Sequence, residues 1–367
     1  MGVSKPACAS WRDWLVRGVT PAPASPAEAR SLLAAARRQG LVGLAASDPA
    51  VLGPLPAEVL AEWRSTARGL LARGVYQLHL AGGLLRRLEK EGIKALPLKG
   101  AAVAEVLYDS PGDRPMADLD LLVLGDVAFA VRVLEDEGFH IVERADHAVA
   151  LRQPASGAVV ELHRSVTSCP GFFPDDATGL DARREAATGM VPWRPSSADL
   201  LVQLSLHAAF QHGFGLSLVQ FLDFRRLLER VPPDLDRVLE AAAVARAEGA
   251  VLLSLAAARV AVGAEAPAAL EDALAARVPA AVRAHARVLA ASDPLTLVAP
   301  ARPSLVAARW VLARGRRLDL VRRTLWPAAW PGQPAEQGPL VPWRRASRLL
   351  ARHATWRRPL TAEPKVP

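Results

Sequence analysis

Residues 96–123 read LPLKGAAVAEVLYDSPGDRPMADLDLLV, and this stretch decides the fold that we expect. Two aspartates, Asp118 and Asp120, begin an apolar run that ends at Leu124 and is typical of a buried strand. Side chains alternate between the two faces of a strand, so both carboxylates should point to the same face. Adjacent carboxylates repel each other unless a cation lies between them, and Mg²⁺ prefers oxygen ligands. The pair therefore predicts a metal site.

Two further features extend this hypothesis. Lys99 and Gly100 close a short apolar segment, where a glycine lets the backbone turn tightly and approach a phosphate. Glu161 is a carboxylate within an otherwise apolar strand, residues 159–163. If that strand neighbours the one that begins at Asp118, three carboxylates converge, enough to hold one or two divalent ions that also bind a polyphosphate.

The composition is that of a folded protein with enough apolar residues for two or three domains. The chain has 367 residues, of which 51% are hydrophobic. No segment reaches ~18 uncharged apolar residues, and the N-terminus lacks the apolar core of a signal peptide, so we expect a cytoplasmic protein without a transmembrane segment. Cys8 and Cys169 fit neither a disulfide framework nor a cysteine-based zinc site, which argues against redox chemistry.

The net charge of +8 comes from the C-terminal segment. Residues 301–367 hold 14 basic and 3 acidic residues, whereas the remaining 300 hold 31 basic and 34 acidic residues. The same segment carries five of the nine tryptophans. Such a segment could meet an acidic protein, nucleic acid or an anionic membrane surface, and its plainer interpretation is a helical cap with a charged outer face.

The order of elements predicts an α+β fold, with a small mixed β-sheet core between two helical regions. We divide the chain into an N-terminal helical region (1–92), an α/β core (93–168), a helical domain (169–300) and a basic Trp/Arg-rich segment (301–367). A capping box at residues 25–28 predicts a helix that ends near Gln39, and a longer helix is expected from about Pro56 to Gly92. We expect this N-terminal region to support the fold and not to form a site.

The core should alternate strands with helices and end in a hairpin. The expected strands are 93–98, 118–124, 139–142, 147–152 and 159–163, and the expected helices between them are 101–107 and 127–137. In the helical domain, the expected helices are 200–211, 216–230, 235–248 and 251–262.

These residues carry a family resemblance. The segments 99–102, 107–108, 114, 118–123 and 160–163 resemble the uncharacterised bacterial nucleotidyltransferase family of the polymerase-β-like superfamily, with weaker similarity at 206–207 and 222–223. The resemblance implies an NTP substrate, Mg²⁺ or Mn²⁺ as the cofactor, and a nucleotidyltransferase-like core at 93–168. It also implies that Gly100 is the phosphate-loop glycine, that Asp118 and Asp120 are the metal pair, and that Glu161 is the third ligand or the base.

The chain departs from the superfamily pattern at Ala101, where a small hydroxyl residue is usual. The backbone amides of Ala101 and Ala102, together with Lys99, could still bind phosphate. Arg114 is expected to contact phosphate as well, because a guanidinium can bind two oxygens at once.

Three residues have two interpretations each. His207 and Asp223 either line the nucleotide or acceptor pocket or form an interhelical hydrogen bond. His163 shares a strand face with Glu161, and a packing or orienting role is more typical of such a histidine than metal binding.

Two functions remain open at this point. The first is a Mg²⁺-dependent nucleotidyltransferase that moves an NMP group from an NTP to a hydroxyl of an unknown small molecule, peptide or protein, in a bacterial biosynthetic pathway. The second is a catalytically inactive nucleotide-binding or scaffold protein that uses its basic segment to bind a partner.

Overall fold

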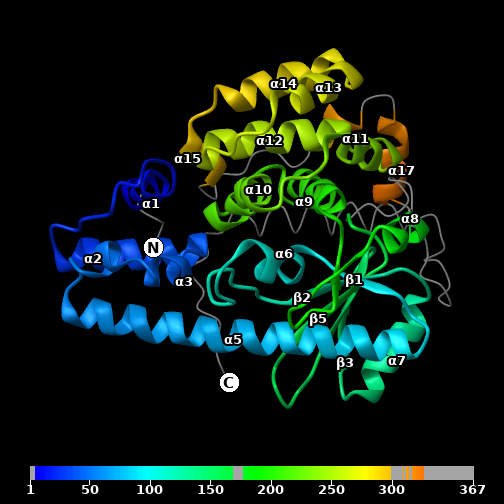
Figure 1. Cartoon of the computed structure of the whole chain (residues 1–367), viewed down its shortest axis with the longest axis horizontal. Helices are drawn as coiled ribbons and strands as arrows, with labels where there is room; N and C mark the ends of the chain where they lie inside the picture. The colour runs from blue at the N-terminus through cyan, green and yellow to red at the C-terminus, as the bar shows by residue number, and fades with distance from the viewer. Residues whose placement is uncertain (1–4, 168–176, 299–308, 310, 314–315, 326–367) are drawn as a thin grey trace.

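The computed structural model describes residues 5–167, 177–298, 309, 311–313 and 316–325 (Figure 1). Cys169 and most of the basic segment 301–367 lie outside the described residues. Within them the fold is α+β, as expected: helices surround a mixed five-stranded sheet. None of the helices in these ranges is long and apolar enough to cross a membrane.

Helices form the N-terminal region up to residue 90. They are α1 (Lys5–Arg17), α2 (Pro26–Gln39), α3 (Val42–Ala46), α4 (Pro49–Leu52) and α5 (Ala57–Lys90). The expected cap of α2 is present, since the Ser25 side chain accepts a hydrogen bond from the Glu28 amide at 3.2 Å. In a capping box the Glu28 carboxylate would in turn accept from the Ser25 amide. Here it accepts from the Ala24 amide.

Helix α5 connects two apolar cores. Near its start, Trp63 packs with the N-terminal helices, and near its end Leu85 and Leu88 pack beneath the sheet. Gly74, in the middle, lies against the loop that leads to the aspartates, and a Cβ there would meet the Pro111 carbonyl oxygen at 2.3 Å. The N-terminal region therefore fixes this loop from outside the sheet.

The sheet has the strand order β1-β2-β5-β4-β3. Its strands are β1 (Ala95–Pro97), β2 (Leu119–Val123), β3 (His140–Arg144), β4 (Ala148–Arg152) and β5 (Val159–His163), with helices α6 (Lys99–Leu107) and α7 (Val127–Asp136) between them. Strand β2 pairs in parallel with β5, and the other neighbours are antiparallel. The expected hairpin is therefore β4–β5. Asp118, expected as the first residue of its strand, precedes β2.

The helical region after the sheet differs from expectation in two places. Where we expected one helix over 235–248, the structure has two, α11 (Leu235–Val244) and α12 (Glu248–Val262). The break is at Arg246, whose φ of +52° lies in the left-handed region and cannot continue a helix. Helix α8 (Ala177–Ala182) and a two-stranded ribbon, β6 (Glu185–Ala186) and β7 (Trp193–Arg194), precede the other helices of this region, where we expected only a loop. The Trp193 indole of the ribbon donates to the Ala95 carbonyl oxygen.

The helices of this region lie above the sheet in Figure 1. They are α8 (Ala177–Ala182), α9 (Ser197–His212), α10 (Leu218–Arg230), α11 (Leu235–Val244), α12 (Glu248–Val262), α13 (Ala268–Arg277), α14 (Ala280–Ala290), α15 (Pro294–Val298) and α17 (Arg317–Leu325), and the ribbon strands are β6 (Glu185–Ala186) and β7 (Trp193–Arg194). Helices α9 to α15 and α17 share an apolar core with the N-terminal helices. The sheet packs mainly on a second core with α5 and α7, which Trp193 of the ribbon also contacts. The division into domains stays a prediction.

Candidate active site

The parallel pairing of β2 with β5 brings two of the predicted carboxylates together. Asp120 lies opposite Glu161 in the strand register. The sequence predicted that the carboxylates converge if these two strands are neighbours. The strands are neighbours, so the prediction holds for Asp120 and Glu161. Asp120 is almost fully buried, whereas the Glu161 side chain is 28% exposed.

His163 joins these two carboxylates. Its Nε2 atom lies 2.8 Å from Asp120 Oδ1 and 3.2 Å from Glu161 Oε2. Being two residues after Glu161 on the same strand, it shares that residue's face. Its hydrogen bond to Glu161 lowers the pKa of that carboxyl group. Burial lowers the pKa of His163 itself, but its hydrogen bonds to both carboxylates outweigh this effect, so the pKa lies above its ordinary value.

Lys99 is the second residue that contacts the Asp120 carboxylate. Its Nζ atom lies 2.6 Å from Asp120 Oδ1, at the first residue of α6. Burial raises the pKa of the Asp120 carboxyl group, but the His163 hydrogen bond and the Lys99 charge outweigh it and hold the pKa below its ordinary range. The φ of Lys99 is +48°, a conformation that costs a non-glycine residue on the order of 1 kcal/mol and is concentrated at functional sites.

Asp118 occupies a different environment from Asp120. It is partly exposed, and its burial together with the nearby Asp120 charge raises the pKa of its carboxyl group to about 6. It does not belong to the closest group of ligand atoms, which comes from Asp120, Glu161 and His163, all within 4.8 Å of one another. Its role as a metal ligand therefore stays a prediction.

A cleft of about 370 Å³ is lined by residues of the core and of both helical regions. Several predicted site residues line it, namely Lys99, Gly100, Arg114, Asp118, Asp120, His207 and Asp223. Ala101 is buried, and neither it nor Glu161 belongs to the lining. Arg37 and Arg38 from α2 also line the cleft, although we expected no site residue there. Basic residues in the last turn of a helix are ordinary, so no sequence signal marked these two as cleft residues.

The start of α6 differs in one respect from expectation. The Ala102 amide, which we expected to bind phosphate, donates to the Leu98 carbonyl oxygen at 3.4 Å. At Gly100, a Cβ would lie 2.6 Å from Met116 Cγ, so close packing is a second reason for a glycine here.

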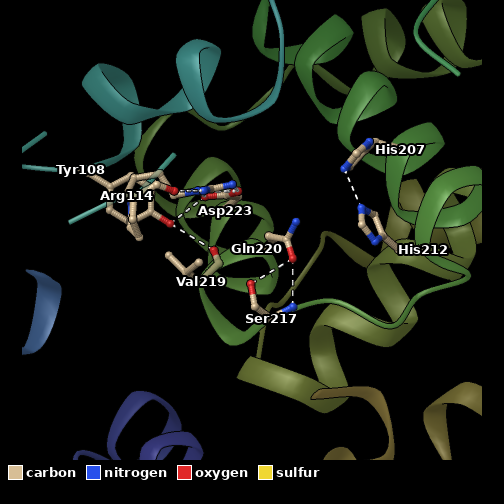
Figure 2. A network of polar contacts seen from close by, with 9 residues as sticks. Tyr108, Arg114, His207, His212, Ser217, Val219, Gln220 and Asp223 are labelled. Carbon is tan, nitrogen blue, oxygen red and sulfur yellow. Dashed lines mark hydrogen bonds and ion pairs between the residues drawn. The ribbon is translucent and has the colours of Figure 1, made fainter. Parts of the chain in front are cut away.

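Arg114 and Asp223 bind each other across the junction between the core and α10 (Figure 2). Arg114 Nη2 lies 2.8 Å from Asp223 Oδ2, and Nε lies 2.9 Å from Oδ1. The Tyr108 hydroxyl group also donates to Asp223 Oδ1, at 2.7 Å. Burial lowers the pKa of Arg114, but the Asp223 charge outweighs it and raises that pKa. Both residues line the cleft, yet their charged groups bind each other, so phosphate binding by Arg114 stays a prediction.

His207 and His212 form a histidine pair near the end of α9 (Figure 2). Their Nε2 atoms lie 3.0 Å apart, so one ring donates and the other accepts. Burial lowers the pKa of both rings, that of His212 to about 4. His207 thus lines the cleft and also forms a hydrogen bond, although within its own helix and not between helices.

The donor set at Asp120 fits a divalent cation. Carboxylate oxygens and an imidazole nitrogen are ordinary ligands of such ions. In addition, the buried Nδ1 atom of His163 has no hydrogen-bond partner among the described residues. The Lys99 ammonium group forms an ion pair with Asp120, and His163 Nε2 lies at hydrogen-bond distance from the same carboxylate.

Comparisons with known proteins identify the family of the chain. A family model described as an uncharacterised nucleotidyltransferase matches residues 25–263, more than half of the chain, from α2 to the end of α12. Among solved structures, the chain is similar to an antigenic nucleotidyltransferase-like protein from Paracoccidioides brasiliensis, with 22% identity over 46% of this chain and 86% of that chain and a TM-score of 0.32. No curated protein matches the chain.

Proposed function

We propose, from the premise that this chain belongs to the uncharacterised nucleotidyltransferase family, that it transfers a nucleoside monophosphate from an NTP to a hydroxyl group of an acceptor. The observation that carries the proposal is the register of Asp120 opposite Glu161, beside a cleft of about 370 Å³. Ligand pockets typically have volumes of about 300–1,000 Å³. We place the reaction in a bacterial biosynthetic pathway.

Three carboxylates would hold the divalent ion in this proposal. Asp120 and Glu161 are the neighbours in the sheet, and Asp118 is the third carboxylate, just before β2. Mg²⁺ or Mn²⁺, when bound, supplies positive charge that neutralises the polyphosphate and stabilises the pyrophosphate leaving group.

The chain's own groups position the reactants. Lys99 and the backbone at Gly100 bind phosphate, and the Arg114–Asp223 pair fixes the loop that precedes Asp118. The acceptor oxygen attacks the α-phosphorus, and the bond from this phosphorus to the bridging oxygen of the β-phosphate breaks, so that pyrophosphate leaves. The hydroxyl proton passes to a carboxylate oxygen of Glu161.

A transfer assay tests this function. The purified full chain is incubated with NTPs labelled at the α-phosphate, Mg²⁺ and pools of small-molecule, peptide and protein acceptors. Asp120→Asn should abolish transfer, whereas Glu135→Gln, which changes an exposed carboxylate on α7, should leave it unchanged. Equal transfer by Asp120→Asn and the wild type contradicts the proposal.

A second candidate function is nucleotide binding without transfer. It is favoured by the ion pair of Lys99 with Asp120, which places an ammonium group at the main candidate ligand, and by the alanine at position 101. NTP binding by the wild type without transfer to any acceptor pool would support this candidate.

A further inference from the structure

The end of helix α2 forms part of the cleft wall and is fixed there by two residues. Gln39 is buried, and its Oε1 atom accepts from the Leu218 amide at 2.8 Å while its Nε2 atom donates to the Val298 carbonyl oxygen at 3.0 Å. Gly40 ends the helix with a φ of +71°, and a Cβ there would lie 2.5 Å from Val219 Cγ1. The last turn of α2 is therefore held against the start of α10.

This last turn brings two arginines to the cleft. Arg37 binds Glu62 and Thr66, so its guanidinium is already used within the N-terminal region. Arg38 is exposed, and in the described part of the chain it has neither an ion-pair partner nor a hydrogen-bond partner for its side chain. It is thus a cation that lines the cleft with its donors available.

The other lysine and arginine side chains that line the cleft already form ion pairs with carboxylates. Lys99 binds Asp120, and Arg114 binds Asp223. An unpaired guanidinium at the surface contributes little to the stability of the fold. Beside a cleft, however, its charge attracts anions. Its planar set of donors matches two oxygens of a phosphate group.

The cleft lining therefore includes groups of opposite charge. The carboxylates of Asp118 and Asp120 come from the core, and the guanidinium of Arg38 comes from the N-terminal region. In the proposed reaction the α-phosphate reacts beside the carboxylates, and the β- and γ-phosphates extend from it along the cleft. They carry most of the negative charge of the substrate.

We infer that Arg38 binds the terminal phosphates of the triphosphate, so that the N-terminal helical region forms part of the substrate site. The inference rests on the proposed function and adds a binding residue to it. An anionic acceptor would present similar oxygens to Arg38, and the test below separates the two.

The test uses inorganic tripolyphosphate and pyrophosphate, which avoids any dependence on the base. Each is titrated into the full chain with Mg²⁺, and affinity is measured by calorimetry. Arg38→Gln should weaken tripolyphosphate binding about tenfold, the usual effect of losing a charge-assisted hydrogen bond, and Arg38→Lys should weaken it less. Arg30→Gln is the matched control, because Arg30 lies on the same helix, is exposed, and binds Glu58 away from the cleft.

Kinetics give a second readout. Arg38→Gln should raise the KM for the NTP about tenfold and leave the KM for the acceptor unchanged. If tripolyphosphate binds Arg38→Gln as tightly as Arg30→Gln, or if only the acceptor KM rises, the inference is wrong while the proposed function stands. If the wild type binds no tripolyphosphate, both are overturned.

Discussion

Asp120 and Glu161 are direct neighbours in a parallel strand pair, and His163 Nε2 lies within 3.2 Å of a carboxylate oxygen of each. Glu161→Gln removes one of these charges and should weaken Mn²⁺ binding by about 10- to 100-fold. Titration of Mn²⁺ monitored by electron paramagnetic resonance measures this affinity. Glu135→Gln is the control for a lost surface charge. Wild-type affinity in Glu161→Gln would exclude that residue as a ligand.

The Arg114–Asp223 pair should contribute strongly to stability. Both side chains are buried, so Asp223→Asn leaves a buried guanidinium without its counter-charge and should lower the free energy of unfolding by about 3 kcal/mol. Urea denaturation measures the loss, and Asp236→Asn on the exposed face of α11 should cost less than about 0.5 kcal/mol. A loss below about 1 kcal/mol for Asp223→Asn would contradict the pairing.

Two glycines of α5 should respond in opposite directions to the same substitution. Gly74→Ala places a methyl group against the Pro111 carbonyl oxygen and should destabilise the protein by about 1–3 kcal/mol. Gly69→Ala meets nothing within 4 Å and should stabilise the helix by about 0.5–1 kcal/mol. Thermal unfolding of both variants checks this, and changes of the same sign would refute the close approach of α5 to the loop.

The histidine pair should make stability depend on pH. Burial holds the pKa of His212 at about 4, below its ordinary value, so the folded protein keeps this ring neutral while the unfolded chain takes up a proton. The free energy of unfolding should therefore fall as the pH drops from about 6.5 towards 4, by on the order of 1 kcal/mol for this ring. Urea denaturation across this range should show a smaller decline for His212→Asn, and an unchanged one for His79→Gln on an exposed face of α5. A decline of wild-type size in His212→Asn would rule out this source.

Local signals in the sequence were enough to predict several elements. The cap at Ser25, the long apolar periodicity of α5 and the apolar run after Asp118 all depend on residues close together in the chain. The prediction of one helix over 235–248 was wrong, because the positive φ of Arg246 has no clear signature in an alanine-rich segment.

Contacts between distant residues could be predicted only in part. That Asp120 meets Glu161 followed once their strands were assumed to pair, which the sequence could not establish by itself. Arg114 and Asp223 are 109 residues apart, and each was predicted separately as a pocket residue without being recognised as the other's partner. Arg38 was missed because its place at the cleft depends on how Gln39 packs against α10.

The position of the bond that breaks is the most direct test of nucleotidyl transfer. The full chain is incubated with Mg²⁺, the acceptor pools, and NTPs labelled at either the α- or the γ-phosphate. We predict that the α-label becomes attached to the acceptor while the γ-label is released as pyrophosphate, and that Asp120→Asn does neither. Transfer of the γ-label to the acceptor would show phosphoryl transfer and would contradict the account.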